Sequence, residues 1–140
     1  MLHEIEVICE ADVILVRQAA MLLGKKIGLG RYRLHALATA VTELAMNQVI
    51  HASGGVIKVL IVQKKDALKN DLVGVEVDCL DHGPGIVDID LAMQDGYSTS
   101  HGLGGGLPGV RRLMDEFEIE SKIGFDSWTR IVTRLWQKSC

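Results

Sequence analysis

The chain has few cysteines, and their positions exclude two common kinds of small domain. Cys9, Cys79 and Cys140 are widely separated and form no C-x-x-C pair. A disulfide-stabilised scaffold or a structural zinc site needs paired or closely spaced cysteines, so we expect neither. Cys9 and Cys79 lie in apolar strand patterns, and we interpret both as small core residues.

The sequence also lacks a long apolar run and a cluster of basic residues. No stretch reaches the length of a membrane span, and Met1 to Glu10 alternates and contains acids, unlike a signal peptide. Lys and Arg number 15 against 18 Asp and Glu, and the net charge of -3 offers no footprint for nucleic acid or an anionic membrane. We expect a cytoplasmic protein with protein or small-molecule partners, and neither nucleic acid nor a membrane among them.

What is present suits one globular domain. With 140 residues, 48% of them hydrophobic, the chain can bury a core, and we expect residues 1–140 to form a single domain. Periodicity and turn signals predict strands at His3–Glu10, Val56–Lys64, Leu72–Asp81, Glu118–Lys122 and Ser127–Gln137, and helices at Ala11–Ile27, Arg33–His51, Asp88–Gln94 and Pro108–Phe117. The second and third strands should form an antiparallel hairpin. This order predicts an α+β two-layer sandwich, with helices on one face of a mixed, mostly antiparallel sheet.

The first chemical signal lies on the second predicted helix. Glu43, Asn47 and His51 are spaced four apart and therefore share one stripe of that helix. No Lys or Arg lies within one helical turn of Glu43, and the neighbouring positions are small or apolar. Such a pair suits the floor of a cleft, where an amide oxygen binds Mg²⁺ and a carboxylate accepts a proton. The alternative is an ordinary exposed Glu and Asn.

The second signal is the sequence D-H-G-P-G-I at residues 81–86. Counting by twos along the preceding strand places Asp81 on the same face as Val77 and Cys79, pointing toward the helices. A buried acid needs a donor, and the exocyclic amine of adenine is one. Gly83 and Gly85 would let the backbone turn beneath a base, whereas the alternative is a strand-ending turn with a solvated Asp81.

The third signal is the glycine-rich segment 94–108. Its glycines, followed by a helix start at Pro108, predict a phosphate-binding loop, and Ser98, Thr99 and Ser100 could donate to phosphate oxygens. A plain flexible loop is the alternative. The G-x-G-x-x-G match at 104–109 follows no strand and lies in no βαβ unit, which excludes a dinucleotide fold. The sequence has no P-loop, H-R-D or D-F-G motif, which argues against P-loop enzymes and eukaryotic-type kinases.

Together these motifs resemble those of the GHKL ATPase superfamily. Glu43-x-x-x-Asn47 resembles its N box, Asp81-x-Gly83-x-Gly85 its G1 box, and Gly102-x-Gly104-x-Gly106 its G2 box. The stretches T-E-L-A-M-N, D-H-G-P-G-I, M-Q-D-G-Y-S-T-S and G-L-P-G-V-R-R-L-M-D-E-F are similar to the RsbT-type serine/threonine switch kinases of bacterial stress signalling, over nearly the whole chain.

The resemblance implies an ATP site and a role for each matching residue. Glu43 would be the catalytic base, Asn47 would hold Mg²⁺, and Asp81 would bind adenine. Residues 102–107 would cover the phosphates, and Thr129 corresponds to the family's terminal threonine. The full set of implied ATP-binding residues is Asn47, Asp81, Gly83, Gly85, Ile86, Ser98, Thr99, Ser100, His101, Gly102, Leu103, Gly104, Gly105, Gly106, Leu107 and Thr129.

The resemblance also implies partners. The family phosphorylates a Ser or Thr of a STAS-domain protein in a stressosome-like complex and is then released to activate a PP2C-type phosphatase. Two alternatives remain open. One is an anti-sigma factor kinase that sequesters a sigma factor, and the other is a non-catalytic module in which ATP only sets partner affinity.

Overall fold

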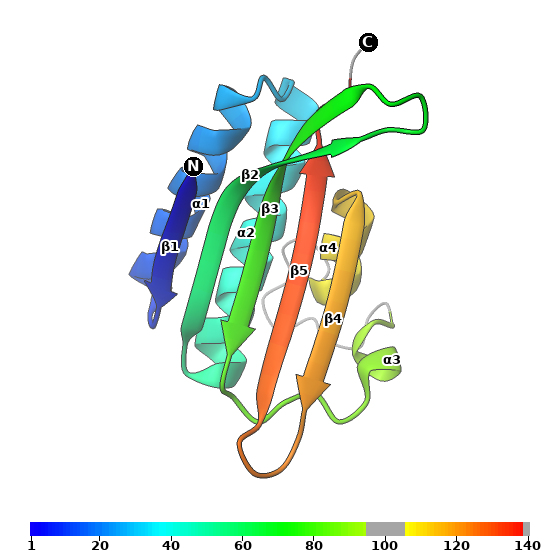
Figure 1. Cartoon of the computed structure of the whole chain (residues 1–140). Helices are drawn as coiled ribbons and strands as arrows, with labels where there is room; N and C mark the ends of the chain where they lie inside the picture. The colour runs from blue at the N-terminus through cyan, green and yellow to red at the C-terminus, as the bar shows by residue number, and fades with distance from the viewer. Residues whose placement is uncertain (95–105, 139–140) are drawn as a thin grey trace.

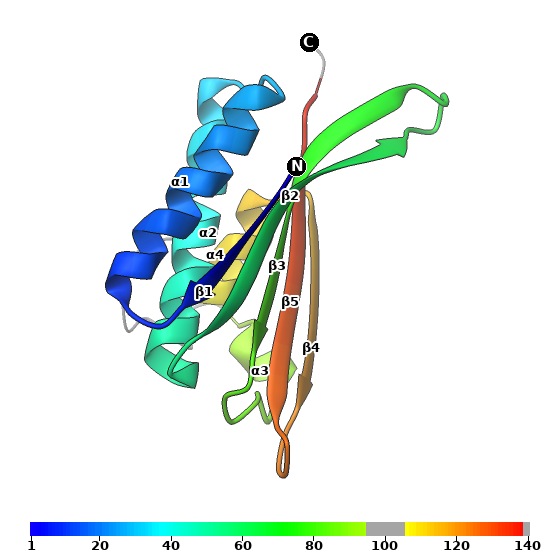
Figure 2. The same cartoon turned by 60° about the vertical axis from the view of Figure 1, so that its left-hand side comes forward.

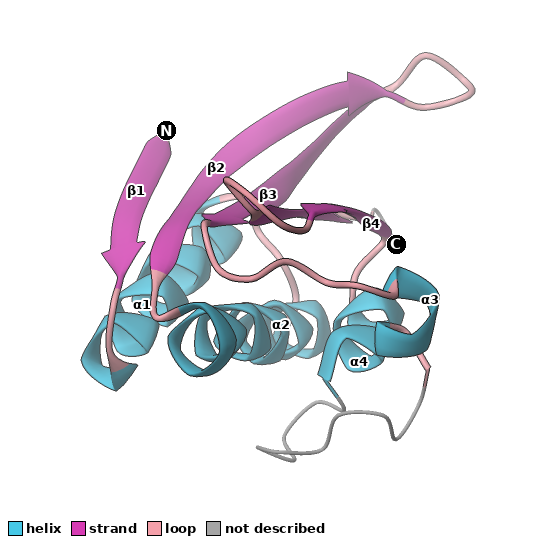
Figure 3. Ribbon diagram, turned by 90° about the horizontal axis from the view of Figure 1, so that it is seen from below, coloured by secondary structure: helices cyan, strands magenta, loops and turns pink. Residues whose placement is uncertain are grey.

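The computed structural model describes residues 1–94 and 106–138, which form a sheet with helices on one face (Figure 1; Figure 2). The elements in chain order are β1 (Leu2–Val7), α1 (Glu10–Lys26), α2 (Arg31–Ala52), β2 (Gly55–Lys65), β3 (Asp71–Asp81), α3 (Ile89–Ala92), α4 (Gly106–Leu113), β4 (Glu116–Lys122) and β5 (Trp128–Trp136). Seen from below, α1, α2 and α4 lie in one layer on one side of the sheet (Figure 3). The predicted α+β two-layer sandwich is confirmed.

The sheet has five strands in the order β1-β2-β3-β5-β4. All four strand pairings in the described part of the chain are antiparallel, including the predicted β2–β3 hairpin. The last strand, β5, lies between β3 and β4, so it runs beside the strand that ends at Asp81. This arrangement sets Thr129 directly opposite Asp81.

The two faces of the sheet differ in chemistry because side chains alternate along each strand. Toward the helices, Ile57, Val59, Val75 and Val77 are fully buried and join the side chains of α2 in the core. The opposite face carries cross-strand ion pairs, among them Arg130 with Asp78 and Arg134 with Glu76. An antiparallel sheet can leave such a face to solvent, and the core lies between sheet and helices.

The predicted helix with Pro108 in its first turn is present, but the prediction that it runs to Phe117 is wrong. Helix α4 begins at Gly106 and ends at Leu113, while Phe117 belongs to β4. The Asp115 carboxylate accepts the Trp136 backbone N–H at 2.8 Å, which pulls the chain into the sheet. Glu116 is then paired with Arg134 across the strands, so strand pairing outweighs the helical pattern of this segment.

The prediction for Cys9 is also wrong. Strand β1 ends at Val7, and Cys9 is the exposed N-cap residue of α1, whereas Cys79 is buried as expected. The Asp12 carboxylate accepts the backbone N–H groups of Ile8 and Cys9 at 2.9 and 3.1 Å, so a cap ends the strand pattern here. Within residues 1–94 and 106–138, every helix is too short or too polar to cross a bilayer.

Candidate active site

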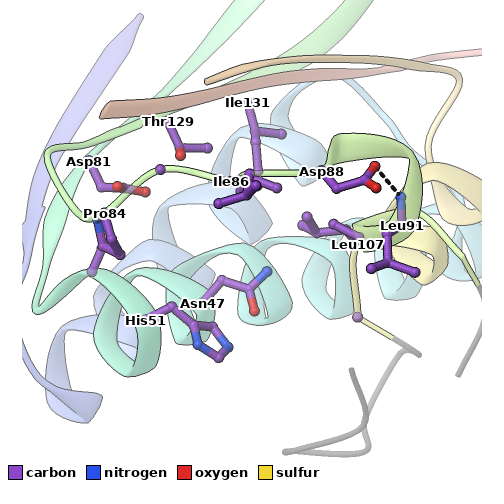
Figure 4. Close-up of a pocket in the computed structure, with 15 residues that line it drawn as sticks. Asn47, His51, Asp81, Pro84, Ile86, Asp88, Leu91, Leu107, Thr129 and Ile131 are labelled. Carbon is purple, nitrogen blue, oxygen red and sulfur yellow. Dashed lines mark hydrogen bonds between the residues drawn. The ribbon is translucent and has the colours of Figure 1, made fainter. Parts of the chain in front are cut away.

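A cavity of about 810 Å³ lies between α2, the segment that follows β3, and the end of the sheet (Figure 4). This volume is in the range of pockets that hold small molecules. Seven residues of the predicted ATP-binding set line it together, namely Asn47, Asp81, Gly85, Ile86, Gly106, Leu107 and Thr129. The sequence-derived motifs are therefore neighbours in space, although they come from α2, the end of β3 and the segment after it, α4 and β5.

Asp81 closes β3 with its side chain on the helix-facing side of the sheet, in the cavity wall. One carboxylate oxygen accepts the backbone N–H of Gly83 at 2.9 Å. Burial raises the pKa of Asp81 above its ordinary value, against the opposing effect of the Gly83 hydrogen bond. The other oxygen is an acceptor that a ligand donor can reach.

Two glycines let residues 82–86 lie close to their neighbours. A Cβ on Gly83 would come within 2.7 Å of the Ala52 side chain at the end of α2. Gly85 has φ of 79°, and a Cβ there would lie 2.4 Å from the backbone oxygen of Lys122. Any side chain at either position would push this segment out of place. Gly83 is buried behind the cavity wall, whereas Gly85 lines the cavity.

Helix α2 contributes Asn47 and His51 to the cavity, both visible on the same side of the helix (Figure 4). Glu43, one turn earlier, is 0% exposed and is not among the cavity-lining residues. The Gln48 amide donates to the backbone oxygen of Leu80 at 3.2 Å and holds this end of α2 against β3. The helix is thus fixed relative to Asp81.

The first residues of α4, Gly106 and Leu107, line the opposite end of the cavity. Backbone N–H groups at a helix start, with the positive end of the helix dipole, favour an anion. Eight residues of the predicted set lie outside the residues that the structure describes: Ser98, Thr99, Ser100, His101, Gly102, Leu103, Gly104 and Gly105.

Sequence reasoning missed the apolar part of the wall. Leu91 and Ala92 of α3 and Ile131 of β5 line the cavity, and they belong to no motif. Alternation along β5 could have placed Ile131 on the same face as Thr129. Nothing in the sequence marks Leu91 as a cavity residue. A largely apolar wall with a few polar groups is typical of pockets that bind small molecules.

Metal ligands are sparse in the part of the chain that the structure describes. No group of three or more His, Cys, Asp or Glu side chains is arranged to hold a metal ion there. Mg²⁺ usually keeps several waters and binds few protein ligands beside substrate phosphates. A single amide oxygen from Asn47, in a cavity that ends at a helix N-terminus, fits this mode of binding.

Fold and cavity together define an α+β domain of the ATPase type that histidine kinases use. The family model described as "Histidine kinase-like ATPase domain" matches residues 9–130. The chain therefore belongs to the histidine kinase-like ATPase domain family.

Individual proteins and one solved structure are also similar to this chain. The chain is 42% identical over 120 residues to "Serine/threonine-protein kinase RsbT" of Bacillus subtilis (strain 168), covering 86% of each chain. It is 34% identical over 98 residues to "Anti-sigma F factor" of Thermoanaerobacter sp. (strain X514), covering 68% of this chain and 66% of the relative. A solved structure, the SiaB-SiaC complex from Pseudomonas aeruginosa, contains a chain with a TM-score of 0.51 at 10% identity, covering 97% of this chain and 89% of that one. That last likeness concerns the fold alone.

Proposed function

We propose that this protein is a serine/threonine-protein kinase that binds ATP in the cavity and transfers its γ-phosphoryl group to a hydroxyl of a partner protein. The observation that carries the proposal is the meeting of three elements in one cavity. They are an acid at the end of β3, an amide on α2 and the N-terminus of α4. The 42% identity to a protein named as a serine/threonine kinase supports the same activity.

The adenine ring occupies the end of the cavity at Asp81. The free acceptor of the carboxylate receives a hydrogen bond from the exocyclic amine, and Ile86, Leu91 and Ile131 offer apolar contact to the ring. Guanine would present a carbonyl oxygen to Asp81 and is rejected. Because the pKa of Asp81 is raised, ATP affinity should fall as the pH is lowered and the carboxylate is protonated. A protonated carboxyl is a weaker hydrogen-bond acceptor than a carboxylate.

The phosphates extend toward Asn47 and the start of α4. The amide oxygen of Asn47 would hold Mg²⁺, and the bound ion would neutralise charge on the phosphoryl group in transfer. Gly106 and Leu107 line the cavity, and backbone N–H groups at this helix start would donate to the same anion. Positioning and charge neutralisation are what phosphoryl transfer mainly requires of a protein.

Glu43 is the base in this proposal. The acceptor hydroxyl oxygen attacks the γ-phosphorus, the bond from phosphorus to the bridging oxygen breaks, and ADP leaves with the electron pair. Glu43 takes the hydroxyl proton, directly or through one water. Glu43 is fully buried one helical turn from Asn47, so the substrate complex must bring the acceptor hydroxyl or one water into its reach, and catalytic contacts commonly tighten in such complexes.

The partners proposed are a STAS-domain substrate of a stressosome-like complex and a PP2C-type phosphatase that the kinase activates after release. Both follow from the resemblance to the RsbT-type switch kinases. Incubation with γ-labelled ATP, Mg²⁺ and candidate STAS-domain proteins tests the first partner, with mass spectrometry to locate the phosphate. Absence of label from every protein hydroxyl, with ATP bound, would leave the chain as an ATP-binding module and defeat the kinase proposal.

A second candidate function is an anti-sigma factor. The 34% identity over 98 residues to a protein named "Anti-sigma F factor" favours this function. Capture of a purified sigma factor by this chain in the presence of ATP would support this function. Label transfer without such capture supports the switch kinase alone.

A further inference from the structure

At the polar end of the cavity, the Thr129 hydroxyl contacts a second hydroxyl, that of Ser121, which no motif includes. Ser121 lies on β4 directly opposite Thr129 on β5, and their hydroxyl oxygens are 2.8 Å apart. Thr129 lines the cavity and is only 6% exposed, and Asp81 is its partner on the other side, on β3. Ser121 is therefore one strand behind the residues that meet the ligand.

The proton of each hydroxyl can be placed from the neighbours of Ser121. The Ile86 backbone N–H donates to the Ser121 oxygen at 2.7 Å, and the Trp128 backbone oxygen lies 3.0 Å from it. A carbonyl can only accept, and a serine hydroxyl has a single proton. When that proton goes to Trp128, the Thr129 hydroxyl must donate to Ser121, and all three contacts are hydrogen bonds.

The opposite arrangement is poorer by one hydrogen bond. If Ser121 donated to Thr129, its oxygen would face the Trp128 carbonyl oxygen at 3.0 Å with no proton between them. A partly buried acceptor that loses its donor costs about 1–3 kcal/mol. The first arrangement is therefore favoured, and it turns the Thr129 proton away from the cavity.

We propose that Ser121 is a positioning residue that fixes the Thr129 hydroxyl as an acceptor, so that Asp81 and Thr129 together admit a nucleobase whose C6 substituent is an amine and reject one whose C6 substituent is a carbonyl oxygen. This inference rests on the proposed ATP site and adds a selectivity that Asp81 alone does not supply. Without Ser121, Thr129 can rotate its proton into the cavity and donate to a carbonyl. Discrimination against hypoxanthine, which carries an oxygen in place of the amine of adenine, then falls.

The test measures dissociation constants of ATP and inosine triphosphate by calorimetry, with Mg²⁺, on the full chain. Discrimination is the dissociation constant of inosine triphosphate divided by that of ATP. In Ser121→Ala this ratio should fall by about fivefold to tenfold, the equivalent of one hydrogen bond. In a Thr129→Val background, Ser121→Ala should leave the ratio unchanged, because Ser121 acts through the threonine hydroxyl. Ser121→Thr keeps a hydroxyl and should restore the wild-type ratio.

Ser127→Ala is the matched control. The Ser127 hydroxyl donates to the backbone oxygen of Gly83, so this change loosens the same loop without touching the Thr129 proton. It should weaken both nucleotides equally and leave their ratio as in the wild type. Loss of discrimination in Ser127→Ala would show that loop looseness, and not proton direction, sets the ratio, and would overturn the inference.

The remaining outcomes separate this inference from the proposed function. If the wild type prefers ATP and the ratio is unchanged in Ser121→Ala, the proposed role of Ser121 is wrong and the ATP site is still supported. An effect of Ser121→Ala that persists in the Thr129→Val background also sinks it. Equal affinity of the wild type for both nucleotides, or binding of neither, contradicts the adenine site itself and the inference with it.

Discussion

Gly85 lies so close to Lys122 that a Cβ on the glycine would come within 2.4 Å of the lysine backbone oxygen. Gly85 also has φ of 79°, in the left-handed region. The contact joins the segment after β3 to the end of β4, and Gly85 itself lines the cavity. The position of the loop that borders the cavity therefore depends on the absence of a side chain at residue 85.

Gly85→Ala should destabilise the fold and weaken ATP binding. The left-handed conformation costs about 1–2 kcal/mol for a residue with a Cβ, and the clash with Lys122 adds to it and moves the loop. Urea denaturation and calorimetry measure the two effects. Gly124→Ala is the matched control, because Gly124 has φ of 86° but open space around it. Equal losses of ATP affinity in both variants would mean that the contact with Lys122 is unimportant.

Asp81→Asn should abolish ATP binding without lowering stability. The amide oxygen would keep the hydrogen bond from Gly83, and the NH₂ group would face the adenine amine, donor against donor. Burial raises the pKa of Asp81, so the ionised carboxylate costs stability near neutral pH, and its removal should leave the unfolding temperature equal or higher. Because the ionised carboxylate is the form that binds adenine, wild-type ATP affinity should fall as the pH falls through this raised pKa.

Asp78→Asn controls for charge on the same strand. Asp78 lies on the outer face, where Arg130 donates to its two oxygens at 3.1 and 2.9 Å. Its loss should cost about 1 kcal/mol of stability or less and leave ATP affinity unchanged. Normal ATP binding by Asp81→Asn would contradict the adenine role of Asp81.

Glu43→Gln should separate binding from catalysis. Glutamine has the shape of glutamate and suits a fully buried position, so ATP affinity should stay within about threefold of the wild type. Without a base, phosphotransfer should fall by about 10²-fold or more. Single-turnover transfer from labelled ATP measures this, with thermal denaturation as the check on folding. A variant that transfers phosphate at the wild-type rate would show that Glu43 is not the base.

Glu116→Gln should reduce stability in a way that depends on pH. Burial tends to raise the pKa of Glu116, but hydrogen bonds from Lys64, Trp136 and Arg134 outweigh it and lower the pKa below its ordinary value of 4.5. The stabilisation is therefore complete above 4.5 and is lost as the pH falls through the lower folded-state pKa. We expect a loss of about 1 kcal/mol at neutral pH, because solvent screens this partly exposed network, and the loss should vanish in acid when measured by urea denaturation at several pH values.

Glu118→Gln provides the comparison on the same strand. Glu118 is largely exposed and lies 3.6 Å from Arg134, so its loss should cost less than about 0.5 kcal/mol at any pH. A Glu116→Gln deficit that stays constant from neutral to acid pH would mean that packing, and not the ionised carboxylate, stabilises this corner of the sheet.

Periodicity along single strands and helices was sufficient to predict which face Asp81, Asn47 and His51 occupy. Alternation along 73–81 placed Asp81 on the helix-facing side of β3, and helical spacing placed Asn47 and His51 on one stripe of α2. Thr129 was reached only through the family resemblance, and Ser121 was not reached at all. Periodicity tells which face of an element a side chain occupies, but it does not tell which element lies next to that face.

The sequence by itself determined the order and approximate positions of the elements, the α+β class and the two motifs around Asn47 and Asp81, because these depend on residues near one another in the chain. Only the tertiary structure decided that β5 inserts between β3 and β4, which brings Thr129 opposite Asp81 and Ser121 behind it. It also decided that Phe117 leaves the predicted helix and that Glu43 is fully buried. The physical reason is that strand pairing and burial are gained between distant segments, whose contacts outweigh local preference.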